Sequence, residues 1–192
     1  MLLDIIKQFN WLDIIVVIIL FRICYIAVKS GLLVELFKIL GTLLAIYLSL
    51  HYYTMLSDFF RNRIAVKSLP LEFLDFLSFT VLAILGYLIF VSLRDLFYHF
   101  IKMEAVPQLS KWGGLILGMG RGILLGGLII FMLMISSVSY LKNSVKDSYS
   151  GKRLFKVAPA TYSALWDNLM SKFATKEKFN STILEVQKYI SQ

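Results

Sequence analysis

The sequence predicts an all-α integral membrane protein with four transmembrane helices and an amphipathic C-terminal helical tail. Hydrophobic residues make up 58% of the 192 residues and charged residues only 17%, whereas soluble domains average about 45–50% and about 25%. Four apolar stretches are each long enough to cross about 30 Å of hydrocarbon as a helix. These spans are expected at about residues 11–28, 32–53, 73–93 and 112–135.

The first two spans are expected to form a helical hairpin. Trp11 opens the first span at a position typical of the membrane interface. The polar residues 29–31 predict a tight turn, and the aromatic run 51–53 marks the far end of the second span. No small-residue cleavage site follows residues 1–10, and Asp13 interrupts the apolar stretch, so we interpret this segment as a retained anchor and not a signal peptide.

Two polar connections separate the remaining spans. The first covers residues 58–71 and is closed by Pro70, and the second covers residues 94–111 and is broken by Pro107. Residues 1–141 therefore form the predicted membrane domain, with both of its ends on one side of the membrane.

The distribution of basic residues leaves the orientation open. Nine Lys and Arg on the side of the two ends, against four opposite, favour a cytoplasmic location for both ends. The margin narrows to nine against seven if Arg22, Lys38 and Arg121 extend to the opposite side.

The fourth span carries a regular stripe of glycines. Seven of the 11 glycines lie between residues 113 and 127. In water each glycine would weaken a helix by about 1 kcal/mol relative to alanine, but in lipid glycines let a neighbouring backbone approach closely. That neighbour is either another span of this chain or a second copy, and we expect a homo-oligomer. The stripe, with residues spaced four apart, is Gly114, Gly118, Gly122 and Gly126.

Four charged residues inside the predicted spans are candidates for function, because such charges are costly in lipid. They are Asp13, Arg22, Glu35 and Arg121. Across the hairpin, Arg22 and Glu35 are offset by about 4.5 Å along the helix axes, so we expect them to pair. Glu35 could instead pair with Lys38 or Arg121, or form a polar relay with Arg121. Asp13 is interpreted as a helix-start residue facing the headgroups.

The last third of the chain differs in character. Residues 142–156 read as a basic surface linker, and Pro159 suits the first turn of a helix. Residues 142–192 are thus expected to hold a linker and interfacial amphipathic helices that lie in the interface or cap the bundle. One apolar face with helical spacing consists of Tyr162, Leu165, Trp166, Leu169, Met170 and Phe173.

No pattern for catalysis or metal binding is found. The sequence has no serine-hydrolase, phosphate-loop or paired-histidine zinc motif, and its single cysteine, Cys24, cannot form an intrachain disulfide. We therefore expect no enzyme activity, cofactor or metal. The formal charge is +8, but the basic residues flank the spans, where the anionic headgroups of the lipid bilayer are the natural partner and not nucleic acid.

Five stretches, in this order, resemble the colicin V production protein (CvpA) family of bacterial inner-membrane proteins. They read FNWLDIIVVIIL, KSGLLVELFKILG, HYYTMLSDFF, GGLILGMGRGILLGG and KVAPATYSALWDNL. The chain differs from the family where Arg22 is not followed by glycine and where Leu33 replaces a common basic residue.

The resemblance implies a multi-pass inner-membrane protein involved in colicin V production or export and in envelope homeostasis. Combined with the glycine stripe, it predicts a non-enzymatic homo-oligomeric scaffold with export or envelope proteins as partners. The alternative is a small oligomeric channel or solute pathway gated near Arg121, although the third and fourth spans offer few polar residues to line one.

Overall fold

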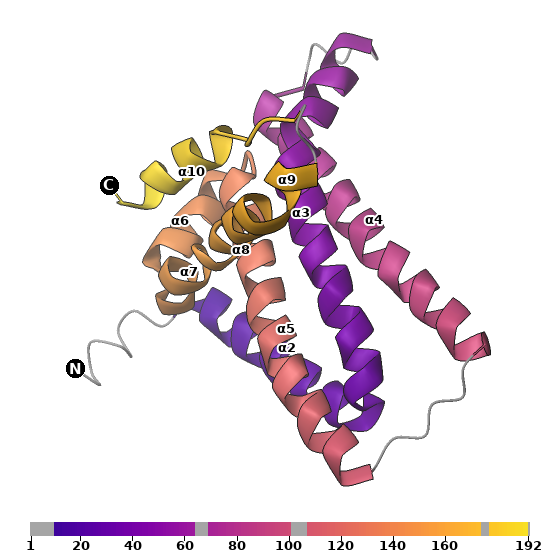
Figure 1. Ribbon diagram of the computed structural model, residues 1–192. Helices are drawn as coiled ribbons and strands as arrows, with labels where there is room; N and C mark the ends of the chain where they lie inside the picture. The colour runs from indigo at the N-terminus through magenta and orange to yellow at the C-terminus, as the bar shows by residue number, and fades with distance from the viewer. Residues whose placement is uncertain (1–9, 64–68, 101–106, 174–176, 192) are drawn as a thin grey trace.

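The computed structural model describes residues 10–63, 69–100, 107–173 and 177–191, and these ranges contain helices and no strand. Four of the helices are long and apolar enough to cross a membrane, which confirms the predicted all-α membrane fold. They are α2 (Trp11–Ser30), α3 (Leu32–Arg63), α4 (Leu71–Phe100) and α5 (Pro107–Ile135), which run up and down the bundle in Figure 1.

The turn between α2 and α3 is as short as predicted. Asn10 caps the start of α2, and the helix ends at Gly31, whose φ of 81° lies in the left-handed region that glycine adopts without strain. The backbone N–H of Leu32 then donates to Oγ of Ser110 at 3.2 Å. This bond joins the turn to the first part of α5.

All four helices are longer than the spans that the sequence predicted. α3 continues ten residues past Tyr53, so part of the predicted connection at 58–71 is helical, and α4 likewise runs on to Phe100. At about 1.5 Å per residue, the 32 residues of α3 measure about 48 Å, more than the hydrocarbon thickness of about 30 Å. One end of α3 therefore extends beyond the hydrocarbon.

Close helix packing is not confined to the predicted glycine stripe. α3 and α4 are antiparallel neighbours along much of their length, whereas α5 packs on both α2 and α3. A Cβ added at Gly86 of α4 would lie 2.8 Å from Cα of Ala45, and one added at Gly41 of α3 would lie 3.2 Å from the carbonyl oxygen of Tyr87. These glycines let α3 and α4 approach each other closely.

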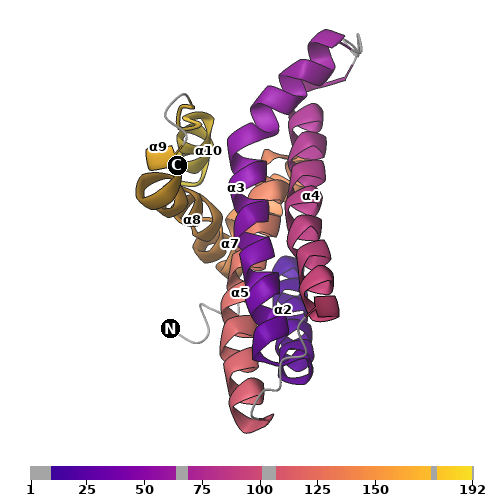
Figure 2. The same ribbon diagram turned by 45° about the vertical axis from the view of Figure 1, so that its right-hand side comes forward.

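The segment after α5 folds back onto the bundle, and Figures 1 and 2 show it against one side of α3 and α5. The predicted linker at 142–156 is wrong in this respect, because most of it is helical. Val145 and Phe155 are buried in the core, whereas the lysines and the arginine are half-buried or exposed. The tail elements are α6 (Ser139–Asp147), α7 (Tyr149–Leu154), α8 (Val157–Leu165), the π-helix η1 (Trp166–Met170), α9 (Ser171–Phe173) and α10 (Thr182–Ser191).

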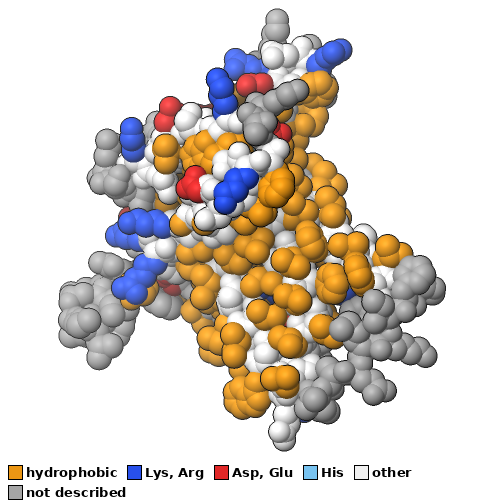
Figure 3. All heavy atoms as spheres, viewed as in Figure 1, with side chains coloured by type: hydrophobic (Ala, Val, Ile, Leu, Met, Phe, Trp, Pro, Cys, Tyr) orange, Lys and Arg blue, Asp and Glu red, His pale blue; other side chains and the backbone are white. Residues whose placement is uncertain are grey.

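The surface separates into an apolar and a charged region. Figure 3 shows hydrophobic side chains covering the spans, and Lys and Arg gathered over the tail and at the upper end of the bundle. Large apolar side chains such as Phe21, Met55 and Ile116 are 73%, 70% and 69% exposed. Exposed apolar surface on this scale is unfavourable in water and natural against lipid chains.

Candidate functional site in the membrane domain

A buried carboxylate, Glu35, is the centre of a charge cluster inside the membrane domain. Glu35 is the fourth residue of α3 and its side chain is fully buried. Its Oε2 accepts a hydrogen bond from Nε of Arg121 on α5 at 2.9 Å, and its Oε1 accepts one from Nζ of Lys38 at 2.7 Å. Both carboxylate oxygens are therefore bonded by cations, as a buried charge requires.

Lys38 orients the cluster toward the α2–α3 turn. Its Nζ also donates to Oγ of Ser30 at 3.0 Å, so the lysine extends back along α3 toward the polar turn. A long side chain that keeps its charged end near an interface is the usual behaviour of lysine in membrane helices. The cluster holds one carboxylate and two cations, and it connects α3, α5 and the end of α2.

The glycine stripe positions Arg121 beside Glu35. A Cβ added at Gly118 would overlap Cβ of Ala27 on α2 and would lie 3.8 Å from Oε2 of Glu35. A Cβ added at Gly114 would lie 2.7 Å from the carbonyl oxygen of Ala27. The absence of side chains at these two positions lets α5 pack directly on α2, next to the start of α3.

The whole stripe contacts segments of its own chain. A Cβ at Gly122 would meet Leu20 of α2 at 2.8 Å, and one at Gly126 would meet Leu154 of α7 at 3.2 Å. Gly127, which is not part of the predicted stripe, also allows a close approach, since a Cβ there would lie 2.9 Å from the carbonyl oxygen of Leu154. Of the two partners that the sequence left open, this fold uses the intrachain one.

The expected pair between Arg22 and Glu35 is not formed. Arg22 is exposed on the outer face of α2, and within the described ranges no ion pair involves it. α2 packs mainly on α5 and contacts α3 little, so the face of α2 that carries Arg22 does not point at α3. Glu35 takes both of its other candidate partners, Lys38 and Arg121.

Asp13 starts a helix as predicted, but the expectation that it faces the headgroups is wrong. Its side chain is buried, and Oδ2 accepts a hydrogen bond from N of Asn10 at 2.8 Å in a capping box. Oδ1 also accepts from N of Ser150 at 2.7 Å and from the Ser150 hydroxyl, and N of Tyr149 donates to Oδ2. Asp13 therefore joins the start of α2 to the start of α7.

A second cluster, at the other end of α3, docks the C-terminal tail. His51 lies between two tail residues, with Nδ1 2.8 Å from the Tyr162 hydroxyl and Nε2 3.1 Å from Oε2 of Glu177. The hydroxyl of Tyr52 donates to Oε1 of Glu177 at 2.7 Å, and Nδ2 of Asn180 donates to the carbonyl oxygen of Leu50 at 2.8 Å. These contacts fasten residues 177–180 to α3.

The Tyr162 hydroxyl links this cluster together. Burial raises the pKa of Tyr162, so the hydroxyl stays protonated at neutral pH. It accepts a hydrogen bond from N of Asn180 at 3.2 Å and shares a second one with Nδ1 of His51 at 2.8 Å. Sequence reasoning missed Glu177 and Asn180, because isolated polar residues after a helix carry no periodic signal.

The predicted apolar face of the tail is only partly used. Tyr162 is fully buried, and Leu165, Trp166 and Met170 pack against the core. Leu169 and Phe173 are 45% and 79% exposed. The π-helical turn η1 explains the difference, since its wider turn shifts the residues that follow it off the face set by α8.

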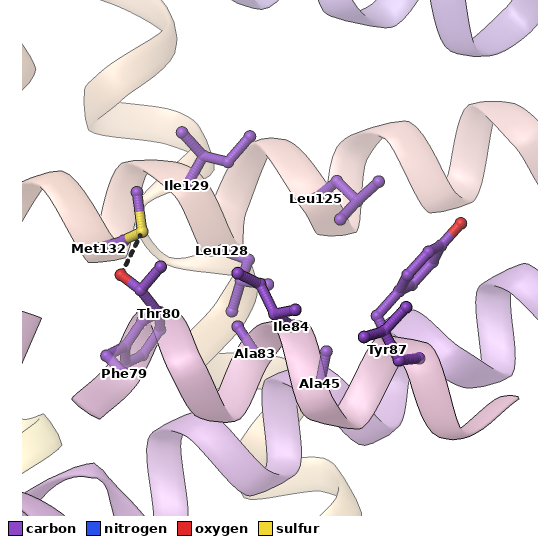
Figure 4. Close-up of a pocket in the computed structure, with 11 residues that line it drawn as sticks. Ala45, Phe79, Thr80, Ala83, Ile84, Tyr87, Leu125, Leu128, Ile129 and Met132 are labelled. Atoms are coloured by element: carbon purple, nitrogen blue, oxygen red, sulfur yellow. Dashed lines mark hydrogen bonds between the residues drawn. The ribbon is translucent and has the colours of Figure 1, made fainter. Parts of the chain in front are cut away.

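Some of the cavities between the spans are apolar. One of about 260 Å³ lies between α3, α4 and α5, and no charged side chain lines it in the described part of the chain. Figure 4 shows Thr80 directed at Met132, to whose sulfur it donates a hydrogen bond at 3.3 Å. Within the described ranges, no group of three His, Cys, Asp or Glu side chains could hold a metal ion.

A comparison with protein families gives a match to the model described as Colicin V production protein, over residues 12–159. No curated protein and no solved structure matches the chain. The match covers all four spans, including Glu35 and Arg121, and ends in α8, before Glu177 and Asn180. Because it spans most of the sequence, it shows that this chain belongs to the colicin V production protein family.

Proposed function

We propose that this protein is a non-enzymatic scaffold of the bacterial cytoplasmic membrane. It serves the production or export of a small peptide toxin such as colicin V, and it contributes to the integrity of the envelope. Family membership supports the link to toxin production. The scaffold role is carried by one observation, the fully buried Glu35 held by Arg121 and Lys38. A carboxylate with both oxygens bonded by cations locks the spans and is poorly suited to moving ions.

Self-association is part of this proposal, and it has to use a face other than the glycine stripe. The stripe is covered by α2 and α7 of the same chain. α4 has the smallest buried share of the four spans, so it offers the most free apolar surface. We therefore assign the contact between copies to the outer face of α4.

Cysteine crosslinking in native membranes tests the self-association. In a Cys24→Ser background, Leu88→Cys places a single thiol on the exposed face of α4, and the matched variant Ile123→Cys places one on α5 at similar exposure, 48% against 44%. Crosslinked dimers of the Leu88→Cys protein in clear excess over Ile123→Cys are expected. Monomers alone for both variants would remove self-association from the proposal.

Export by living cells tests the cellular role. A strain lacking the gene is expected to secrete less peptide toxin, and the wild-type gene is expected to restore secretion. The Glu35→Gln variant should restore it poorly, while Arg22→Gln, a charge removed from the outer face, should restore it fully. Unchanged toxin secretion in the deletion strain would contradict the assignment to toxin production.

Flux from liposomes distinguishes a scaffold from a channel gated near Arg121. Liposomes holding folded wild-type protein are expected to retain ions and small solutes. Flux through the wild-type protein that is altered by Arg121→Leu or Gly118→Leu would replace the scaffold with a channel, because both substitutions act at the charge cluster.

A further inference from the structure

A cavity with charges of both signs lies at the end of the bundle where the tail packs. Its volume is about 330 Å³, within the usual range of small-molecule sites. Tyr53, Met134 and Ile135 are almost fully buried and form its apolar base. α10 contributes Thr182 and Val186 to its wall. The cavity is separate from the Glu35 cluster, which lies near the opposite end of α3.

Two carboxylates and two lysines line this cavity from different helices. Glu72 and Asp75 lie one turn apart on the first part of α4, and Lys142 and Lys146 lie one turn apart on α6. Residues three or four apart share a helix face, so each pair presents a single charge sign to the cavity.

The two pairs do not neutralise each other. Among the described residues, no ion pair joins a carboxylate of the cavity to either lysine, and the side chains of Glu72, Lys142 and Lys146 have no hydrogen-bond partner. Asp75 accepts one hydrogen bond, from the Ser57 hydroxyl. Asp75, Lys142 and Lys146 are half-buried and Glu72 is exposed at the rim. Half-buried charged groups whose hydrogen-bonding capacity is not filled favour a ligand that supplies partners.

We propose that this cavity binds a phosphoethanolamine group, with its ammonium on Glu72 and Asp75 and its phosphate on Lys142 and Lys146. A primary ammonium has three N–H donors for carboxylate oxygens, and phosphate oxygens form charge-assisted bonds with lysines. A purely anionic headgroup would leave the carboxylates unpaired beside a negative charge.

The residue types favour ethanolamine over choline. A trimethylammonium group has no N–H to donate and is typically bound by several aromatic rings. Tyr53 is the single aromatic side chain that lines the cavity in the described part of the chain. The carboxylates therefore match a primary amine better than a quaternary one.

The position favours a lipid as the source of this group. α4 begins at Leu71 and α5 ends at Ile135, so the cavity lies where two spans begin and end, at the depth of lipid headgroups. A base of buried apolar residues below a charged opening also matches the change from glycerol to headgroup. Free phosphoethanolamine shares the same chemistry, and the experiment separates the two sources.

Native mass spectrometry of the full-length protein released from nanodiscs tests the proposal. The nanodiscs hold equal amounts of phosphatidylethanolamine, phosphatidylcholine and phosphatidylglycerol. The wild-type protein is expected to retain phosphatidylethanolamine several-fold over both other lipids. Glu72→Gln should remove the preference over phosphatidylcholine, and the double variant Lys142→Ala, Lys146→Ala should lower retention of phosphatidylethanolamine several-fold.

Matched controls keep the test specific. Asp167→Asn removes an exposed acid of the tail, and the double variant Lys152→Ala, Lys156→Ala removes two exposed lysines outside the cavity. Both control proteins should keep the wild-type lipid preference. Equal retention of the three lipids by the wild-type protein, or a preference that neither set of cavity variants changes, would overturn the proposal.

A second measurement identifies the source of the group. Free phosphoethanolamine is added to the protein in phosphatidylcholine nanodiscs, and thermal stability is followed. Stabilisation that Glu72→Gln abolishes assigns the site to the soluble compound, and retention of the lipid without such stabilisation assigns it to the headgroup. Neither retention nor stabilisation would overturn the proposal.

Discussion

Two glutamates, Glu35 and Glu177, each join segments that are far apart in the sequence, but they do so in opposite surroundings. The side chain of Glu35 is fully buried among the spans and is bonded by Arg121, whereas that of Glu177 is 37% exposed and is bonded by His51 and Tyr52. The bonding chemistry is similar. The difference in burial means that loss of Glu35 leaves cations without a counter-charge in the spans, while loss of Glu177 exposes groups that water can solvate.

The two regions also differ in what brings the partners together. Around Glu35, helix backbones approach closely because Gly118 has no side chain, so Arg121 cannot move away without separating α5 from α2. Around Glu177, aromatic rings such as those of Tyr162 and Phe179, whose centroids are 5.0 Å apart, provide the contact area. The first arrangement is rigid by packing, and the second can open locally while the spans stay folded.

Replacement of Glu35 by glutamine should have the largest effect. It keeps the shape but removes the charge, so Arg121 and Lys38 stay buried without a counter-ion, which costs about 3–5 kcal/mol. The free energy of unfolding in mixed detergent micelles measures it. The same chemical change at Glu177 is the matched control, and an equal loss of stability for the two variants would contradict the contrast in burial.

A methyl group at Gly118 should have the next largest effect. Gly118→Ala places a Cβ where it overlaps Cβ of Ala27, and such overpacking costs about 1–3 kcal/mol. Gly120→Ala is the control, because its Cβ would lie 3.6 Å from Ile39, an ordinary contact.

A compensating substitution tests the geometry directly. Ala27→Gly combined with Gly118→Ala moves the methyl group from α2 to α5 and should recover most of the lost stability. If the double variant is no more stable than Gly118→Ala in the same unfolding assay, the close approach of α5 to α2 is not what limits stability at this position.

Glu177→Gln should act only on the tail. Because the pair with His51 is partly exposed, its loss is expected to cost about 1 kcal/mol or less. Hydrogen exchange should increase in α8 and α10 while exchange in α2–α5 stays as in the wild-type protein. Faster exchange throughout the spans would show that the tail is required for the fold of the membrane domain.

Arg22→Gln should have the smallest effect. Arg22 is exposed and has no ion-pair partner within the described ranges, so unfolding should shift by no more than about 0.5 kcal/mol. A loss of stability comparable to that of Glu35→Gln would instead support the ion pair between Arg22 and Glu35 that the hairpin spacing predicted.

The contacts of the C-terminal tail could be predicted only in part from the sequence. Helical periodicity placed Tyr162 and Trp166 on one apolar face, and both side chains pack in or against the core. The same repeat placed Phe173 on that face, but the π-helical turn broke the register and left this side chain 79% exposed. Isolated polar residues such as Asn180 form long-range contacts without a periodic pattern in the sequence.

The sequence by itself determined the all-α membrane fold and its four long apolar helices, and it carries the glycine stripe in the fourth of them. These features depend on local rules, since a backbone in lipid has to satisfy its own hydrogen bonds and a fixed thickness sets the length of each span. The tertiary structure alone decided that Glu35 binds Arg121 and Lys38 and that Asp13 accepts hydrogen bonds from the start of α7. These contacts depend on which helix faces pack against each other. The close contact of α5 with α2 at Gly118 determines the neighbours of Glu35, and no single helix specifies that contact.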